Sequence, residues 1–267
     1  MADILTLVFR KFMSQPGLKK SSAADPPPPT DCGSTLLVGD HSISRSVMLL
    51  AAVTAASDLG VRVMFFTQTP IQSLPVSLQT CVPSLNPESL KKIKFSYPRT
   101  VEELLQQVAS LHESMSPLPP SLIVVDRLET FLCAPGRHPG EQSCAAHLSA
   151  LLCDTAAFFT EVLQQQSSSS APCRVLVSFQ SDSGPVGGLS SATDPVLDVL
   201  DRYFQVRCSL DQDRGYDAAA AGLQELWHVY LSGTGVTDDK DCEDRLGVAQ
   251  EWQLSVFPSG LLEFRPV

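Results

Sequence analysis

Short apolar runs alternate with longer amphipathic segments through most of this 267-residue chain. The runs are rich in valine, isoleucine and phenylalanine, which favours buried strands, and the segments between them have the spacing of amphipathic helices. Strands that alternate with helices in this way form parallel sheets that helices cover on both faces. The predicted strands are residues 35–39, 61–67, 93–97, 121–126 and 174–179, and the predicted helices are residues 46–59, 101–113 and 143–165.

The two ends of the chain follow other patterns. Residues 227–233 and 251–267 alternate polar and apolar positions around a Pro-Ser-Gly turn, which predicts antiparallel strands at one edge of the sheet. Residues 1–34 join a short apolar stretch, "ILTLVFRKF", to a linker with four consecutive prolines, which favours an extended conformation. We therefore predict an N-terminal arm and proline-rich linker over residues 1–34 and one α/β domain over residues 35–267. The apolar stretch is either a helical arm, which could dock on a neighbouring subunit, or an extra strand of the same sheet.

Charge and cysteine content narrow the classes of partner and compartment. The net charge is −10 and the isoelectric point is near 4.9. Proteins that bind nucleic acid alone usually have the opposite charge balance, because neutralising phosphates provides most of their affinity. The eight cysteines stand singly, which favours a reducing compartment such as the cytosol or the nucleus. No apolar run reaches the ~20 residues of a membrane span, so we expect no membrane contact.

The turn after the first strand has the position of a phosphate-binding P-loop but only part of its composition. A P-loop reads G-x-x-x-x-G-K-[ST] between a strand and a helix. When Gly39 is aligned with the first glycine, Ser44, Arg45 and Ser46 take the places of the second glycine, the lysine and the hydroxyl residue. The glycines let main-chain N–H groups surround phosphates, and arginine carries the lysine's charge in a larger planar group. A nucleotide site, the remnant of one and an ordinary strand-to-helix turn all stay open.

Asp126 ends an apolar strand, "SLIVVD", as the acid that orients Mg²⁺ does in P-loop NTPases. Ligands of open α/β sheets bind at the carboxyl ends of the strands, where Asp126 is expected. A carboxylate that merely ends a buried strand explains the pattern equally well. If a nucleotide binds, Ser46 and Asp126 are the candidate Mg²⁺ residues.

Several segments together resemble one family. The order of strand, polar loop, long helix and strand ending in glutamine is similar to the core of RecA-type recombinases. The strings "FFTQTPIQSLP", "LKKIKFSYPRTVEELL", "CDTAAFF" and "LDRYF" more narrowly resemble the SWIM-domain-associated recombinase paralogue of the animal Shu complex. This resemblance extends over residues 36–208. It implies a RecA-like P-loop NTPase core, with a mostly parallel, doubly wound sheet and antiparallel C-terminal strands.

The resemblance also implies roles for single residues. It assigns Gly39, Arg45 and Ser46 to the phosphate loop and Asp126 to Mg²⁺. Active recombinases carry a glutamate that positions the attacking water at the end of the second strand. Gln68 stands there, and an amide cannot accept a proton.

Gln180 matches the glutamine that senses the terminal phosphate in the family. ATP and Mg²⁺ are therefore the cofactors that the resemblance implies, and the composition of the P-loop and of residue 68 puts them in doubt.

The two loops that face DNA in recombinases correspond to residues 134–142 and 181–195. The first contains Arg137 and His138, but the second has no basic or aromatic residue. Single-strand binders use a positive groove and stacking aromatic side chains, so the second loop is poorly suited to that role. One further basic cluster is either a DNA contact or the solvated side of a half-buried strand. It contains Lys91, Lys92 and Lys94.

We therefore expect a recombinase-paralogue subunit of homologous-recombination repair in the nucleus. The resemblance implies a heterodimer with a SWIM-domain zinc-binding protein, which binds single-stranded DNA and supports filaments of a RecA-type recombinase. Alone, this acidic chain should bind single-stranded DNA weakly. One alternative is an active DNA-stimulated ATPase that uses Arg45 in place of the lysine. Another is a RecA-like scaffold without DNA contact.

Overall fold

The computed structural model describes residues 4–13, 33–81, 87–113, 119–132, 140–166, 172–181, 194–215, 222–233 and 248–267. The strands are β1 (Ser34–Val38), β2 (Val63–Phe66), β3 (Ile93–Ser96), β4 (Leu122–Val125), β5 (Arg174–Phe179), β6 (Val206–Asp213), β7 (Glu225–Gly233), β8 (Val248–Val256) and β9 (Leu262–Pro266). The helices are α1 (Ile4–Lys11), α2 (His41–Ser57), α3 (Val76–Cys81), α4 (Pro87–Leu90), α5 (Val101–Ala109), α6 (Leu128–Leu132), α7 (Glu141–Gln166) and α8 (Pro195–Tyr203).

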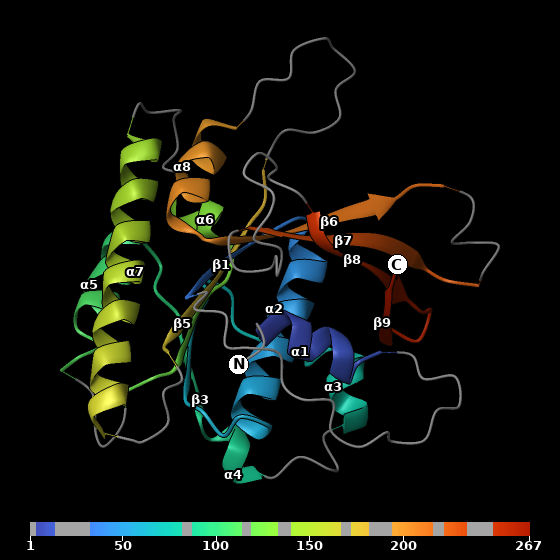
Figure 1. The fold of residues 1–267 in the computed structure, drawn as a ribbon, viewed down its shortest axis with the longest axis horizontal. Coiled ribbons are helices and arrows are strands. Elements are labelled where there is room, and N and C mark those ends of the chain that lie inside the picture. Colours follow the sequence, from blue (N-terminus) through green and yellow to red (C-terminus); the bar gives the residue numbers. More distant parts are fainter. Residues whose placement is uncertain are drawn as a thin grey trace, which may run out of the picture.

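One mixed sheet contains these strands in the order β3-β2-β4-β5-β1-β6-β7-β8-β9 (Figure 1). The strands from β3 to β6 in this order are parallel. The pairs β6–β7, β7–β8 and β8–β9 are antiparallel. The predicted fold class, a mostly parallel α/β sheet with antiparallel C-terminal strands, is confirmed.

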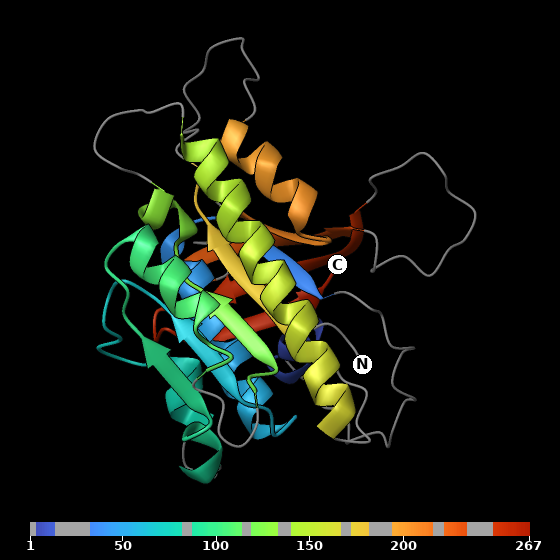
Figure 2. The same cartoon turned by 90° about the vertical axis from the view of Figure 1, so that its left-hand side faces the viewer.

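Helices cover both faces of the parallel part of the sheet. On one face α1 and α2 pack against the sheet, and on the other α5 and α7 do (Figures 1 and 2). Neighbouring residues of one strand therefore enter different cores: Leu37 packs with α2, whereas Leu36 packs with α7. Because both of their faces are buried, β1, β2, β4 and β5 read as continuous runs rather than as alternating ones.

The N-terminal apolar stretch forms helix α1 and packs into the core of its own domain. Phe9 is fully buried and its ring stacks on Phe264 of β9, with 4.6 Å between ring centroids. Lys11 pairs with Asp58 after α2, with 2.8 Å between Nζ and Oδ1. The stretch is therefore a helix, as one of the two alternatives had it, and it packs on the core of its own chain. The rest of the predicted linker, residues 14–32, lies outside the described residues.

The short helices α3, α4 and α6 were not predicted from the sequence, nor were α8 and β6. Helix α8 begins with Asp194 as its N-cap, whose side chain accepts a hydrogen bond from the N–H of Val196, and with Pro195 at its first turn. Strand β6 pairs with β1 on one side and β7 on the other. It is the strand through which the parallel and antiparallel parts join.

Helix α7 is long and apolar enough, by length and composition, to cross a membrane. A core helix passes the same test, and α7 places Leu148, Leu152 and Phe159 fully inside the core. The buried share of the apolar window is 33%, so packing on the sheet accounts for one face of α7 and not for the whole helix.

Candidate functional site

The turn between β1 and α2 is shorter than a P-loop. Only Gly39 and Asp40 separate the two elements, and α2 already begins at His41. The positions that a P-loop would wrap around phosphates are thus in the first turns of a helix. Gly39 has a packing role here, because a Cβ added to it would lie 2.7 Å from Cβ of Leu210 in β6.

Asp40 places a carboxylate at the N-terminus of α2. Its Oδ1 accepts hydrogen bonds from the main-chain N–H of Ser42 at 2.9 Å and from the Ser42 hydroxyl at 2.6 Å. Burial alone would raise the pKa of Asp40, but the hydrogen bonds from Ser42 outweigh it and lower that pKa. A negatively charged cap therefore takes the position in which a helix N-terminus would bind an anion.

The two serines of the P-loop register have separate environments. Ser44 is 1% exposed, and its Oγ has no hydrogen-bond partner in the part of the chain that the structure describes. Ser46 donates its hydroxyl proton to the carbonyl oxygen of Ser42, one helical turn back, at 2.9 Å. That bond closes within α2, and no hydrogen bond joins Ser46 to Asp126 among the described residues.

Arg45 pairs with Asp126. The Arg45 Nη2 and Nε atoms lie 2.7 Å and 2.9 Å from Asp126 Oδ2. Thr67, directly after β2, accepts from Arg45 Nη2 at 3.1 Å and donates to the same carboxylate oxygen at 2.9 Å. The Asp126 side chain is 0% exposed and that of Arg45 is 24% exposed. The residue types expected to hold the terminal phosphate and Mg²⁺ thus neutralise each other.

The other carboxylate oxygen of Asp126 faces β5. Ser178 donates its hydroxyl proton to Asp126 Oδ1 at 3.4 Å and accepts from the main-chain N–H of Arg127 at 2.8 Å. Arg127 has a φ of 60°, which is uncommon for a residue with a side chain. Backbone strain of this kind persists where surrounding contacts fix the conformation. The bond to Ser178 is one such contact.

Glu129 and Gln180 meet beside this network. The main-chain N–H of Gln180 donates to Glu129 Oε2 at 3.1 Å, and Arg127 Nε lies 3.1 Å from Glu129 Oε1. Burial raises the pKa of Glu129, although hydrogen bonds from these neighbours and the charge of Arg127 act in the opposite direction. Gln180 therefore lies at the carboxyl ends of the parallel strands, where the sequence register places it. Its main-chain N–H is hydrogen-bonded to the Glu129 carboxylate.

Gln68, which follows β2, is bonded to the loop before α5 and to helix α6. Its Nε2 donates to the carbonyl oxygens of Arg99 at 3.1 Å and Thr130 at 3.3 Å. Gln68 was predicted from the sequence, whereas Thr67, Ser178 and Glu129 were not. A usable signal was present, because Thr67 is the hydroxyl residue that directly follows a buried strand.

The candidate DNA residues do not gather around Asp126. Arg137 and His138 lie outside the described residues. Lys91 and Lys92 precede β3, whereas Asp126 follows β4, and in a parallel sheet those ends lie at opposite edges. Their Nζ atoms lie 2.6 Å from Glu88 and 2.9 Å from the Gly60 carbonyl oxygen, respectively. Lys94 is exposed on β3.

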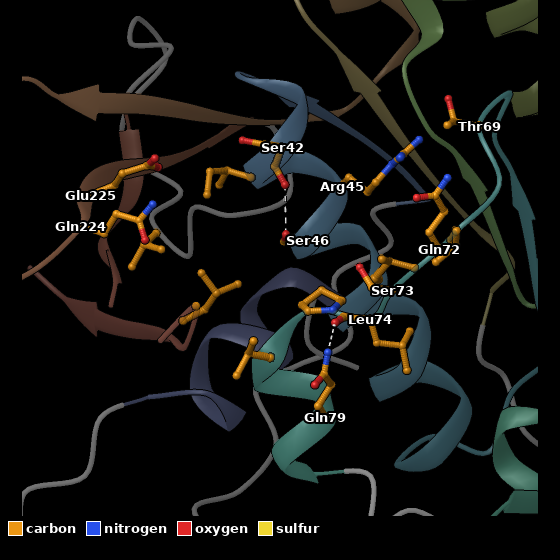
Figure 3. A pocket seen from close by; sticks show the side chains of 18 of the residues that line it. Ser42, Arg45, Ser46, Thr69, Gln72, Ser73, Leu74, Gln79, Gln224 and Glu225 are labelled. Carbon is orange, nitrogen blue, oxygen red and sulfur yellow. Dashed lines mark hydrogen bonds between the residues drawn. The ribbon is translucent and has the colours of Figure 1, made fainter. Parts of the chain in front are cut away.

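A cavity of about 650 Å³ opens beside the N-terminal half of α2 (Figure 3). One wall is α2, a second is the segment from Thr69 to α3, and a third comes from β7, β8 and the β8–β9 turn. Arg45 belongs to this lining as well as to the ion pair. The carboxyl-edge network and the cavity therefore meet at one side chain.

The sequence of this chain is similar to those of two known proteins. No protein-family model matches it. Over its full length the chain is 34% identical to the Mus musculus protein named ATPase SWSAP1 and covers 82% of it. Over 67% of its length it is 36% identical to the Homo sapiens protein of that name and covers 71% of it. The match to the mouse protein covers the whole chain, whereas the resemblance predicted from the sequence covered residues 36–208.

Among solved structures, a KaiC-like protein of the archaeon Pyrococcus horikoshii OT3 superposes with a TM-score of 0.54. The superposition covers 88% of this chain and 89% of that one, at 10% sequence identity. A likeness at this identity concerns the fold alone. It supports the RecA-like architecture of the described sheet.

Proposed function

Because this chain belongs to the SWSAP1 family and has a RecA-like fold, we propose that it is a recombinase-paralogue subunit in homologous-recombination repair of DNA double-strand breaks. In this proposal it forms a heterodimer with a SWIM-domain zinc-binding protein in the nucleus. The heterodimer binds single-stranded DNA and supports assembly of RecA-type recombinase filaments. The nucleotide site of this subunit is degenerate.

The observation that carries the last statement is the ion pair between Arg45 and Asp126. A nucleotide with Mg²⁺ needs a cation free to meet the terminal phosphate and an acid free to orient the metal. Here the two groups are bonded at 2.7 Å, and Thr67 holds the same carboxylate oxygen. Asp40 also places negative charge at the helix N-terminus, where the phosphates would lie. The described residues do not fit ATP and Mg²⁺.

The rival proposal, an ATPase that uses Arg45 as its P-loop cation, requires a larger rearrangement. Arg45 would have to leave a carboxylate that is 0% exposed, and the first turn of α2 would have to unwind into a loop. Removing one member of a buried ion pair is typically unfavourable by about 3–5 kcal/mol. The free energy of ATP binding would have to exceed that cost for the rearranged site to form.

The charge distribution supports DNA binding by a complex rather than by this chain alone. The net charge is −10, and Lys91 and Lys92 are engaged by groups of their own chain. Lys94 and the unplaced Arg137 and His138 are the candidate contacts that a partner's basic surface would supplement. A scaffold without DNA contact differs from this proposal in one observable, the affinity of the purified heterodimer for single strands.

The nucleotide proposal is tested by ATP binding and turnover of the full chain co-purified with a SWIM-domain protein. We expect no saturable binding of Mg-ATP and no DNA-stimulated phosphate release. Turnover of about 1 per second, the low end for ordinary enzymes, that Asp126→Ala abolishes would contradict the degenerate site. Loss of heterodimer in the variant is monitored by size-exclusion chromatography, so that a folding defect is not read as a catalytic one.

The partner and DNA proposals are tested on the same preparation. Co-expression should give a stable heterodimer, and its affinity for a single-stranded oligonucleotide at about 150 mM salt should exceed that of this chain alone. Charge reversal at Lys94 and Arg137 should weaken binding, and charge reversal at the exposed Arg265 should not. A monodisperse monomer that ignores the SWIM-domain protein would contradict the heterodimer. A heterodimer without DNA affinity would favour the scaffold.

A further inference from the structure

The cavity beside α2 has the size of a ligand site and a mixed lining. Its volume is about 650 Å³, within the usual range for sites that bind small molecules or short segments. Gln72 from the segment before α3 and Gln224 before β7 stand on opposite walls (Figure 3). Neither amide side chain has a hydrogen-bond partner among the described residues. Between these walls the lining is aliphatic, with Ile43, Leu49, Ile71, Leu74, Val76, Val256 and Leu262.

The lining excludes two classes of ligand. Its charged members among the described residues are Arg45 and Glu225, of which Arg45 is neutralised by Asp126 and Glu225 accepts a hydrogen bond from the Trp227 indole N–H at 2.9 Å. A phosphate-bearing ligand would find no uncompensated cation there. The described lining residues also include no aromatic ring on which a nucleic-acid base could stack. Polyanions and unstacked bases are therefore poor occupants.

The chemistry that matches is that of an extended peptide. Each main-chain peptide group presents one hydrogen-bond donor and one acceptor. A glutamine side chain can pair with either, because its amide carries a carbonyl oxygen and an NH2 group. Aliphatic side chains of such a segment would bury against the floor formed by Leu49, Val256 and Leu262, each less than 10% exposed already. Hydroxyls at the rim, from Ser73 and Thr69, add further hydrogen-bonding groups.

We propose that this cavity binds a linear, uncharged segment of a partner protein, through one or two aliphatic side chains and main-chain hydrogen bonds to Gln72 and Gln224. The inference rests on the proposed loss of the nucleotide, because Arg45 lines the cavity. It assigns to this RecA-like subunit a peptide site where the register predicts a nucleotide. Peptide recognition by main-chain hydrogen bonds and apolar pockets is a recurring mode.

The test uses the full chain and a phage-displayed library of random linear heptapeptides as its probe. We expect the selected sequences to be uncharged and rich in leucine, isoleucine or valine. A synthetic copy of the strongest binder, measured by fluorescence anisotropy, should lose about tenfold in affinity to the double variant Gln72→Ala/Gln224→Ala, because it lacks two neutral hydrogen-bonding groups. Gln106→Ala, an exposed glutamine on α5, is the matched control and should bind unchanged.

A second variant, Leu74→Asp, puts a charge on the aliphatic wall and should abolish binding. Thermal unfolding of each variant establishes that it is folded. Selection of no peptide, selection of acidic or basic peptides, or unchanged binding by both cavity variants would overturn the inference.

Two further arms separate this inference from the proposed function. Mg-ATP that displaces the peptide would contradict the degenerate nucleotide site itself. If neither ATP nor any peptide binds, the proposed peptide site is refuted and the proposed degenerate nucleotide site stands. In the purified heterodimer, a photoreactive benzoylphenylalanine in place of Ser73 should cross-link to the partner chain. Cross-links within this chain, or to a second copy of it, would overturn the partner as occupant.

Discussion

Replacing Arg45 with methionine tests the central ion pair through the free energy of unfolding. Methionine has similar length and no charge, so among the described residues the variant leaves the buried Asp126 carboxylate with side-chain hydrogen bonds from Thr67 and Ser178. Breaking a buried pair by removing one member typically destabilises by about 3–5 kcal/mol. Arg45 is 24% exposed, so water compensates in part and the low end, about 3 kcal/mol, is expected.

The assay is urea unfolding followed by the fluorescence of the chain's two tryptophans, Trp227 and Trp252, both of which lie in the core. With a denaturant slope of about 3 kcal/mol per molar, a loss of about 3 kcal/mol lowers the midpoint by about 1 M urea. Arg265→Met removes an exposed arginine from β9 and serves as the control, with an expected change below about 0.5 kcal/mol.

A double-mutant cycle separates the interaction energy of the Arg45–Asp126 pair from the effect of each single substitution. Asp126→Leu alone should also destabilise, because it leaves Arg45 without its carboxylate. The double variant Arg45→Met/Asp126→Leu should be far more stable than the sum of the single changes indicates, since replacing a whole buried pair with apolar groups is often nearly neutral. Additive effects, or a loss below about 0.5 kcal/mol for Arg45→Met, would refute the bonded pair as the state of the folded protein.

Three further predictions use single positions. Gly39→Ala should destabilise by about 1–3 kcal/mol in chemical unfolding because the new Cβ would lie 2.7 Å from Cβ of Leu210, whereas Gly33→Ala, with open space around it, should not. Glu129→Gln should gain stability relative to the parent as pH rises. Burial raises the folded pKa of Glu129 above 4.5, so its contribution is present below that value and is lost through the folded pKa, which unfolding curves from about pH 4 to about pH 7 would detect. Cys173, whose pKa burial raises to about 12, should resist iodoacetamide at about pH 8 until the protein unfolds, as measured by mass spectrometry.

The fold was largely predictable because the parallel strands carry an unambiguous signal. Strands β1, β2, β4 and β5 are buried on both faces, and all four were predicted, as was the edge strand β3. Strand β6 was missed, although it buries Val206, Cys208 and Leu210 in alternation. It follows α8 with almost no loop, so no turn residue marks its start. The start of α8 had a local signal in Asp194 and Pro195, an N-cap followed by proline.

The candidate site was predictable in position but not in its bonding. The register placed Arg45 and Asp126 close together, and their side chains are in contact. Sequence spacing could not show that they bond to each other, because that depends on the rotamer of a long side chain. Nor could it show the partners Thr67 and Ser178, which reach Asp126 from the strands on either side of β4.

One physical cause connects the short turn to the ion pair. Glycine at position 44 would disfavour a helix by about 1 kcal/mol, whereas serine there lets α2 extend back to His41, where Asp40 can cap it. Once the helix begins that early, residue 45 lies in its second turn and projects from the helix side instead of from a phosphate loop. A flexible lysine there would meet Asp126 as a point charge, but arginine brings Nε and Nη2 to the same carboxylate oxygen. The substitutions at positions 44 and 45 therefore support each other. Together they convert the layout of a nucleotide site into a closed structural contact and leave the adjoining cavity for another occupant.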